Sequence, residues 1–257
     1  MTAAKEKQAG AISARGAAKG LRAVILAGGK GVRLRPFTAS FPKPLVPLGD
    51  MPIIEVLMRR LVHFGITDIT LTLGHLAELI KAYFLHRKEF TSQINLHYVD
   101  ETRPTGTAGS LAFVQELDDT FLVMNGDVLT DLDFDELVTF HKKQGAALTI
   151  AMHERRVKID LGVLDFDSDY RVTGYREKPE NIYYVSMGVY VYEPRTLRHI
   201  EPGKYLDFPD LVLRLIAAGE KVCAMPSGSL WLDIGRPDDY ALAQEMFDKK
   251  KGDFDLG

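Results

Sequence analysis

The sequence has a single cysteine, a single tryptophan and no long apolar run. With only Cys223, the chain cannot form an internal disulfide, which suits a reducing compartment. Lysine and arginine number 32 against 35 aspartates and glutamates, so the net charge of −3 favours neither nucleic acid nor an anionic membrane surface as a partner. No stretch approaches the length of a membrane-spanning helix. The remaining composition is typical of a globular α/β protein.

The first 20 residues also lack large apolar side chains, and alanine, lysine and glycine dominate them. Such a segment cannot bury enough surface to offset the entropy of ordering, so we predict that residues 1–20 form a disordered tail. They contain no apolar core of a signal peptide, and a cytoplasmic protein is expected. The positive charge of the tail leaves organelle targeting open as an alternative.

From residue 21 onward, short apolar runs alternate with amphipathic stretches, which predicts a single domain over residues 21–250. Its first half, about 21–147, alternates strands and helices and so indicates a mostly parallel sheet flanked by helices, a Rossmann-like α/β fold. The expected strands are 21–27, 68–74, 94–99 and 120–124, and the expected helices are 52–64, 76–84, 110–117 and 135–144. In the second half, about 148–235, consecutive strands at 148–153, 162–166, 172–177 and 183–192 predict an added antiparallel portion. A helix at 207–218, strands at 221–225 and 230–234, and a closing helix at 237–249 complete the pattern.

A glycine-rich turn, Gly28-Gly29-Lys30-Gly31, follows the first predicted strand. Backbone N–H groups at this position can hold phosphates at the carboxyl edge of a sheet. The sequence does not match a P-loop, because Lys30 is followed by Gly31 rather than Ser or Thr. It also lacks the third glycine of a dinucleotide-binding motif. Read alone, the two glycines could also form only a tight turn.

The acidic residues Asp127 and Asp233 each follow a short apolar strand. Both therefore project at the carboxyl edge, where ligands of α/β proteins bind. Two carboxylates at such an edge suit a Mg²⁺ ion that takes its other ligands from water and phosphate. Either aspartate alone could instead be a helix cap or a turn residue.

The run Leu26-Ala-Gly-Gly-Lys-Gly-Val-Arg-Leu-Arg-Pro36, followed by Pro42-Lys-Pro-Leu-Val-Pro47, closely resembles the signature of sugar-1-phosphate nucleotidylyltransferases. That signature reads L-A-G-G-x-G-T-R-L-x-P and then P-K-P-L-x-P, and here Val32 replaces the usual threonine. The resemblance continues through Asn125-Gly-Asp127, Glu177-Lys-Pro179, Met187-Gly-Val-Tyr190 and Trp231-Leu-Asp-Ile-Gly235. It spans nearly the whole chain from Arg22 to Phe247, and mannose- and heptose-1-phosphate guanylyltransferases look most similar.

The resemblance implies an enzyme that joins a sugar 1-phosphate to the α-phosphorus of a nucleoside triphosphate and expels pyrophosphate, by in-line displacement with Mg²⁺. It implies that Asp127 and Asp233 hold the metal. It also implies that Arg33 contacts the triphosphate and that Lys43 bridges the reacting phosphates, so the implied catalytic groups are Arg33, Lys43 and Asp127. The nucleotide-binding residues it implies are Leu26, Ala27, Gly28, Gly29, Gly31, Arg33, Gly106 and Thr107.

The sugar side falls in the second half. By resemblance, Glu177 accepts hydrogen bonds from sugar hydroxyls, Lys178 holds the sugar phosphate, and Gly162 lets the backbone approach the ring. Ser186 and Gly188 belong to the same implied set. Ser186 stands where the family often has asparagine, and this departure leaves the exact hydroxyl contact open because a hydroxyl reaches less far than an amide.

The base is expected to contact the loop from Glu101 to Gly109. Its ending Gly106-Thr-Ala-Gly109 resembles the L-G-T-A-G of guanylyl-transferring members, although Thr105 replaces the leucine. The two acceptors of the Glu101 carboxylate match the adjacent N–H donors of guanine, so GTP is favoured over dTTP and UTP. A solvent-facing Glu101 remains the alternative.

Other hypotheses about the function remain open beside the leading one. The same fold could transfer a nucleotidyl group to a non-sugar phosphate or phosphonate, or could serve as a regulatory subunit that only binds a nucleotide sugar. A monomer or a homodimer is expected, with an NTP and a sugar 1-phosphate as the small-molecule partners. The sequence does not identify the sugar.

Overall fold

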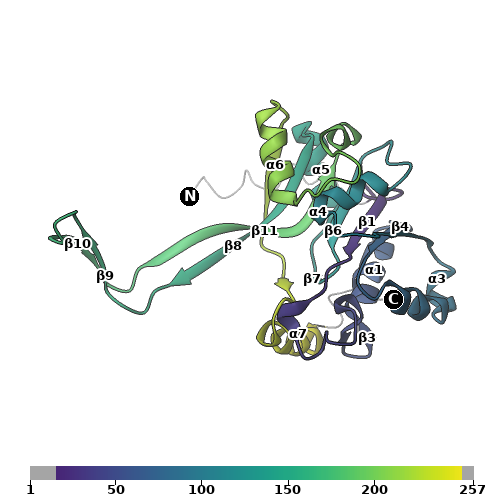
Figure 1. Cartoon of the computed structure of the whole chain (residues 1–257), viewed down its shortest axis with the longest axis horizontal. Coiled ribbons are helices and arrows are strands. Elements are labelled where there is room, and N and C mark those ends of the chain that lie inside the picture. The colour runs from purple at the N-terminus through teal and green to yellow at the C-terminus, as the bar shows by residue number, and fades with distance from the viewer. Residues whose placement is uncertain (1–15, 251–257) are drawn as a thin grey trace, which may run out of the picture.

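The computed structural model describes residues 16–250, and its frame is a seven-stranded sheet with the order β12-β8-β11-β6-β1-β4-β5. The four strands of the first half, β1 (Arg22–Ala27), β4 (Asp68–Leu73), β5 (Asn95–Asp100) and β6 (Phe121–Asn125), run parallel. β11 (Glu180–Tyr192) is antiparallel to both β6 and β8 (Leu148–Lys158), while β12 (Val222–Ser227) is parallel to β8. The expected mostly parallel, mixed sheet is therefore confirmed (Figure 1).

Helices cover both faces of this sheet because its central strands are apolar on both sides. Along β1, Ala23 and Ile25 pack into one apolar cluster, whereas Val24 packs into another on the opposite face. This is the period of two that a strand imposes on its side chains. The first cluster receives α1 (Ile53–His63), α2 (Ala77–Leu85) and α5 (Phe134–Gln144), and the second receives α4 (Gly106–Gly109) and α6 (Phe208–Ala217).

A third apolar cluster lies beneath the sheet and brings the last helix against the loops that follow β1. It joins Leu34, Leu48 and Ile53 to Ile234 and Phe247. These residues come from η1 (Val32–Leu34), β2 (Pro47–Leu48), α1 and the segment around β13 (Trp231–Asp233) and α7 (Pro237–Lys250). β13 also pairs with β7 (Val128–Thr130), and β2 pairs with β3 (Met51–Pro52). The cluster holds the two ends of the domain together.

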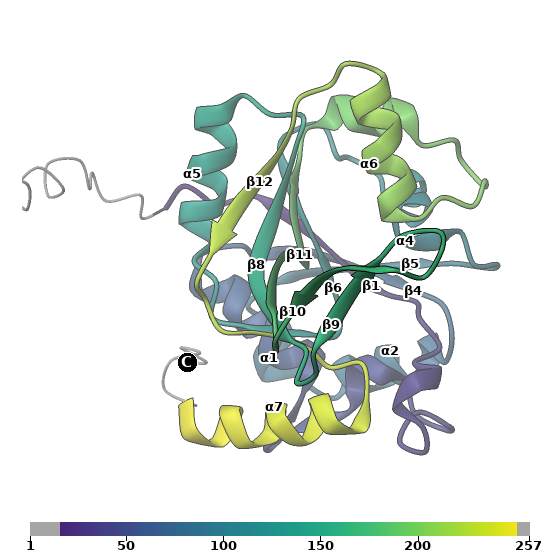
Figure 2. The ribbon, with the colours of Figure 1, turned by 90° about the vertical axis from the view of Figure 1, so that its left-hand side faces the viewer.

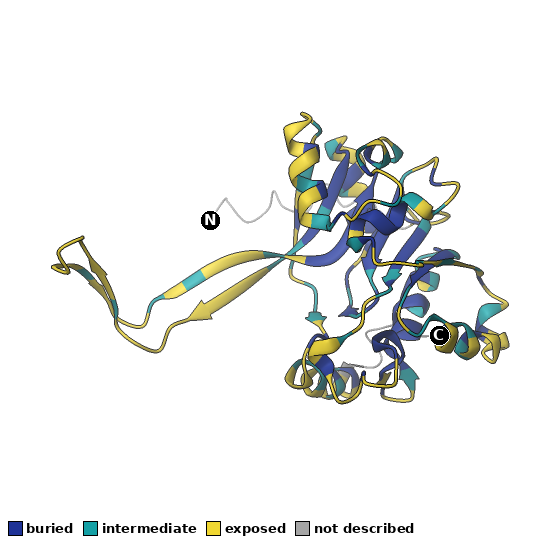
Figure 3. Cartoon of the chain, in the orientation of Figure 1, coloured by how far each residue is buried: buried dark blue, intermediate teal, exposed yellow. Residues whose placement is uncertain are grey.

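A long two-stranded ribbon projects from the sheet (Figure 1). We call residues 152–186 the arm and the remainder of the described chain the body. The arm consists of the outer parts of β8 and β11, which pair with each other, and a terminal hairpin of β9 (Val163–Phe166) and β10 (Val172–Arg176). No residue from 152 to 186 is buried, as the yellow colouring of Figure 3 shows. Viewed along the arm, α5 and α6 flank the sheet and α7 crosses below it (Figure 2).

The remaining short elements are η2 (Lys43–Leu45), α3 (Lys88–Thr91), η3 (Ser110–Phe113) and η4 (Pro194–His199). The helix predicted for 110–117 is wrong, because this stretch contains only the 3-10 turn η3 after the one-turn α4. The backbone leaves helical geometry at Val114, which is extended with φ −81° and ψ 123°, and Glu116 has a left-handed φ of +59°. Pro52 is the N-cap of α1 rather than its first helical residue. The predicted strands in the second half are correct in place but β8 and β11 are longer, since they continue into the arm.

The boundary of the predicted tail also needs correction. The carboxylate of Asp135, in the first turn of α5, accepts hydrogen bonds from the N–H groups of Gly16 and Ala18 at 2.8 and 2.7 Å. Ala18 is fully buried and belongs to the first apolar cluster. Residues 16–20 therefore pack against the body, and the rest of the predicted tail, residues 1–15, lies outside the described residues. Within residues 16–250, no helix is both long and apolar enough to cross a membrane.

Candidate functional site

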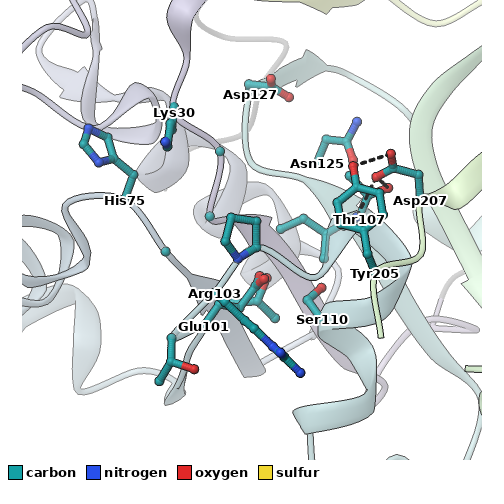
Figure 4. A pocket seen from close by; sticks show the side chains of 18 residues that line it. Lys30, His75, Glu101, Arg103, Thr107, Ser110, Asn125, Asp127, Tyr205 and Asp207 are labelled. Carbon is teal, nitrogen blue, oxygen red and sulfur yellow. Dashed lines mark hydrogen bonds between the residues drawn. The ribbon is translucent and has the colours of Figure 1, made fainter. Parts of the chain in front are cut away.

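The loops that leave the carboxyl ends of β1, β4, β5 and β6 surround a cavity of about 640 Å³. Parallel strands bring their carboxyl ends to one edge of the sheet, which explains why residues distant in sequence meet there. Six of the predicted nucleotide-binding residues and one predicted metal ligand line it: Leu26, Gly28, Gly29, Glu101, Gly106, Thr107 and Asp127. Figure 4 shows Lys30 and Asp127 toward one end of the cavity and Ser110 toward the other.

The glycines of the first loop are needed where the chain passes close to neighbouring groups. A Cβ at Gly28 would lie 3.2 Å from Oε1 of Glu101 and 3.4 Å from the backbone N of Gly74. Gly31 has a φ of +59°, and a Cβ there would lie 2.9 Å from the Cβ of Lys43. The glycines therefore allow the chain to pack closely as well as to turn. Gly31 packs against Lys43 and does not line the cavity. Ala27 is buried in β1 and does not line the cavity.

Lys43 is a buried base that pairs with Asp127. Its ammonium donates a hydrogen bond to Oδ2 of Asp127, and only 10% of the Lys43 side chain is exposed. The surrounding segment is apolar, since Pro44 and Leu45 of η2 are buried beside it. A lysine this enclosed at the edge of a cavity is a fixed positive charge, suited to phosphate oxygens. Arg33 in η1 lies nearby, and its Nη2 is 3.4 Å from the Cβ position of Gly235.

Asp233 is brought to Asp127 by the pairing of β13 with β7. The register places Asp233 opposite Val128, and the N–H of Ile234 donates to the carbonyl of Asp127 at 3.0 Å. Burial raises the pKa of the Asp233 carboxyl, and repulsion by Asp127 raises it further. The positive charges of Lys43 and Arg33 oppose this shift. The two predicted metal ligands therefore share one electrostatic environment. In residues 16–250 no group of three or more His, Cys, Asp or Glu side chains is placed to hold a metal.

A smaller cavity of about 320 Å³ adjoins the first, and Thr107 and Asn125 line both. Ser186 and Gly188, at the root of the arm, line it together with Asp233 and Trp231. Gly188 has a φ of +71°, and a Cβ there would lie 2.6 Å from Nδ2 of Asn125, so no larger residue fits beside that amide. The indole of Trp231 donates to the carbonyl of Met187 at 2.7 Å and is half-buried. Trp231 thus joins the root of the arm to the wall of this cavity.

At the other end of the first cavity, the Glu101 carboxylate is partly engaged by its own loop. Its Oε2 accepts hydrogen bonds from the backbone N–H and the hydroxyl of Thr105, at 3.1 and 2.8 Å. This leaves Oε1 facing the Gly28 loop, so the pair of free acceptors assumed from the sequence is reduced. Ser110, whose role no sequence motif indicates, lines the cavity with a buried hydroxyl that has no hydrogen-bond partner among the described residues.

Asp207 and Tyr205, also missed from the sequence, line the side of the first cavity. Asp207 accepts hydrogen bonds from the Thr107 N–H and the Tyr205 hydroxyl, at 3.2 and 2.6 Å (Figure 4). The Thr107 hydroxyl in turn accepts from the N–H of Phe208 at the start of α6. Thr107 thus joins the α4 loop to α6 as well as lining the cavity. Asp207 follows no strand and precedes an ordinary helix, so its sequence position indicates only a helix cap.

The remaining predicted sugar-side residues, Gly162, Glu177 and Lys178, lie on the arm and line neither cavity. Glu177 and Lys178 stand between β10 and β11, and Gly162 precedes β9. The structure therefore gathers the predicted nucleotide and metal residues at one edge of the body but separates these three from it.

Comparison with known proteins identifies the class of protein. A family model described as "Nucleotidyl transferase" matches residues 22–250, and the chain belongs to this family. The motifs named in the sequence and the cavity at the carboxyl edge agree with that membership.

Two curated relatives are named for reactions of sugar 1-phosphates. It is 34% identical over 238 residues to a UTP–glucose-1-phosphate uridylyltransferase of Synechocystis sp., covering 86% of this chain and 61% of that protein. It is 33% identical over 227 residues to the mannose-1-phosphate guanylyltransferase catalytic subunit beta of Drosophila pseudoobscura pseudoobscura, again covering 86% and 61%. The chain thus spans under two thirds of the length of these relatives.

Solved structures support the fold. HddC from Yersinia pseudotuberculosis, complexed with GMP-PN, is 26% identical with a TM-score of 0.64, covering 88% of this chain and 99% of that one. A structure from Bacillus anthracis has a TM-score of 0.68 at 24% identity and bears on the fold alone.

Proposed function

We propose that this protein transfers a nucleotidyl group from a nucleoside triphosphate to a sugar 1-phosphate and releases pyrophosphate. The observation that carries the proposal is the pair of adjoining cavities, which share Thr107 and Asn125 and are lined by Asp127 on one side and Asp233 on the other. The larger cavity suits a nucleotide and the smaller a sugar phosphate. Their junction is where the two reacting phosphates would meet, as the in-line displacement requires.

Asp127 and Asp233 would hold a Mg²⁺ ion at this junction. Their fit to a cation rests on geometry, because the pairing of β13 with β7 and the hydrogen bond from the Ile234 N–H to the Asp127 carbonyl bring the two aspartates to one place. Two carboxylates suit an ion that also takes phosphate oxygens as ligands. When bound, Mg²⁺ would neutralise phosphate charge and orient the α-phosphate.

The basic side chains of the body would bind and orient the phosphates. Lys43, held by Gly31 and paired with Asp127, would contact the oxygens of both reacting phosphates. Arg33 would bind the phosphates that leave, because its guanidinium can hold two oxygens at once. Lys30 lines the larger cavity and would face the same phosphates.

Guanine is the proposed base, as in the guanylyltransferase relatives and in the HddC complex with GMP-PN. Oε1 of Glu101 and the unpaired hydroxyl of Ser110 would receive its edge. Because Oε2 of Glu101 is bound by Thr105, the carboxylate offers less than the two free acceptors first assumed. The relation to a uridylyltransferase makes UTP the competing substrate.

The sugar phosphate would enter the smaller cavity, where Ser186 and Gly188 form one wall. Glu177, Lys178 and Gly162 are the proposed groups for the sugar hydroxyls, the sugar phosphate and the close backbone approach. The protein is proposed to act in the cytoplasm, in keeping with its single cysteine.

Pyrophosphate release, measured with GTP, UTP, dTTP, ATP and CTP against a panel of sugar 1-phosphates at millimolar Mg²⁺, tests the function directly. We expect release with at least one pair and none without a sugar phosphate. Absence of release with every pair would refute the proposal.

The base assignment is tested by Glu101→Gln. An amide replaces one acceptor by a donor, so the ratio of kcat/KM for GTP to that for UTP should fall by about tenfold. Glu78→Gln, on an exposed position of α2, is the matched control. An unchanged ratio would remove Glu101 from base recognition.

A further inference from the structure

The arm exposes apolar side chains that a folded chain normally covers. Half or more of the surface of each of Leu164, Phe166, Val172, Tyr175 and Tyr183 is exposed. None of the three apolar clusters of the described chain includes an arm residue. A two-stranded ribbon without cover is only marginally stable in water, and a large exposed apolar patch marks a surface that binds something.

The hairpin at the end of the arm has two unlike faces. Leu164 pairs with Tyr175 and Phe166 pairs with Val172, and these apolar residues share a face. The other face carries the ion pair of Asp165 with Arg176 at 3.2 Å. Such alternation is typical of a sheet with one face packed against a body and the other in water. Among the described residues, no apolar cluster packs against this face.

The same hairpin carries an ordered group of polar residues. The Tyr175 hydroxyl donates a hydrogen bond to Oε2 of Glu177 at 3.0 Å. That hydroxyl also lies 2.0 Å from where a Cβ of Gly162 would stand, so only glycine allows the tyrosine this position. Lys178 follows Glu177 directly, with a left-handed backbone conformation of φ +43°. The arm thus presents an oriented carboxylate with an ammonium on the next residue, and these groups suit the hydroxyls and phosphate of a sugar phosphate.

The arm leaves the body at the functional edge of the sheet but carries this group away from it. Ser186 and Gly188 at its root line the smaller cavity, whereas no residue from 152 to 185 lines either cavity. β12 accompanies β8 only as far as His153, and β6 accompanies β11 only from Val189. Beyond those points the outer edges of both arm strands have no strand partner in the described chain.

We infer that two copies of this chain exchange arms, so that the arm of one copy closes the sugar side of the other copy's site with Glu177 and Lys178. The inference rests on the proposed function. The occupant is a second copy because each chain carries the groups that its own site lacks, and a two-fold exchange satisfies both sites at once. The exchange also covers the apolar face of each hairpin and the free strand edges. Tyr175 is then a positioning residue that orients Glu177.

Complementation between inactive variants tests the exchange. Asp127→Asn disables the body and Lys178→Ala disables the arm, and each variant alone should lose pyrophosphate release. In dimers formed after co-expression, the intact body of one chain meets the intact arm of the other, and about a quarter of wild-type activity should return if the chains pair at random. A mixture of Asp127→Asn with Lys43→Ala is the matched control, because both changes lie in the body and no site is complete.

Association is measured separately from activity, by sedimentation of the full chain across a range of concentrations. The wild type should be a dimer, and Phe166→Ser with Val172→Ser should dissociate it. Leu213→Ser, which alters an equally exposed apolar residue on α6, should leave the dimer intact. This readout needs no substrate, so it stands even if no sugar phosphate is turned over.

The outcomes are distinct. If the wild type releases no pyrophosphate with any substrate pair, the proposed function fails and sedimentation alone judges the arm contact. If the active protein is a monomer, or if the mixed variants recover no more activity than the control mixture, the arm serves its own chain and the exchange is overturned.

Discussion

The body and the arm show two ways in which one chain uses strands. β11 belongs to both: its residues from Met187 to Tyr192 are buried in the sheet, while Glu180 to Ser186 are exposed or half-exposed in the arm. In the body, the strand packs between β6 and β8 and beneath helices. In the arm it has one strand neighbour and no helix. The same local structure is thus stabilised by burial in one region and only by pairing in the other.

Stability and function are divided differently between the two regions. The body contains the apolar clusters, the glycine-rich loop and the two aspartates, so its packing and its chemistry are linked. The arm contributes polar groups at its tip but little to the core. A region that buries nothing within its own chain is free to bind another surface, and that is the basis of the proposed exchange.

The largest effect is expected in the body, for Asp127→Asn. Loss of one carboxylate removes a proposed metal ligand and the partner of Lys43, so turnover should fall by at least about a hundredfold. Pyrophosphate release measures it, with circular dichroism to show that the fold persists. Asp119→Asn, at an exposed position, is the control. Near-normal turnover in the first variant would place the chemistry elsewhere.

The next largest effect is expected on the free energy of unfolding, which should respond to substitutions in the body much more than in the arm. Leu122→Ala in β6 removes a fully buried side chain and should lower the free energy of unfolding by about 2–5 kcal/mol. Leu164→Ala in the arm, where half the side chain is exposed, should change it by less than about 0.5 kcal/mol in dilute protein. Denaturant titration checks both, and equal losses would show that the arm folds as part of the core. If arms pair between copies, the effect of Leu164→Ala should grow with protein concentration.

Gly31→Ala separates backbone strain from the packing of Lys43. Gly31 and Gly145 have nearly equal φ values of +59° and +58°, but only at Gly31 would a Cβ meet Lys43. Each alanine should reduce stability by roughly 1–2 kcal/mol through its left-handed conformation. Only Gly31→Ala should also reduce kcat/KM, because it displaces Lys43. Similar activity in the two variants would show that the glycine is needed for the turn alone.

The smallest expected effect is the pH dependence at Asp233. Its pKa is raised in the folded protein, so the charged carboxylate is disfavoured there, and the stability present in acid is lost as pH rises through the folded pKa. Asp233→Asn should therefore raise Tm slightly at neutral pH, with a difference that vanishes in acid. Tm measured across the pH range decides this, with Asp118→Asn as the exposed control. A lower Tm at neutral pH would contradict the proposed repulsion from Asp127.

Much of the fold follows from local patterns that tertiary contacts did not override. The apolar run of β1, the glycine that ends α5 and the consecutive strands of the second half all predicted elements correctly. The stretch after Gly109 did not, because the chain becomes extended at Val114 and left-handed at Glu116 after one 3-10 turn. The prediction that residues 16–20 are disordered was also wrong because of a distant contact. The Asp135 carboxylate binds the N–H groups of Gly16 and Ala18, in a segment with almost no large apolar side chains.

For the site, the sequence predicts roles for the loop glycines, Arg33, Lys43 and the two aspartates, because these residue types occur in long motifs at the ends of apolar strands. Contacts between distant segments could not be predicted: Lys43 pairs with Asp127, Thr105 occupies one oxygen of Glu101, and Ser110, Tyr205 and Asp207 line the same cavity. The tertiary structure also places Glu177 and Lys178 on a projecting arm. The reason is physical: a motif specifies which groups stand near one another along the chain, whereas strand pairing and packing specify which distant groups meet in space.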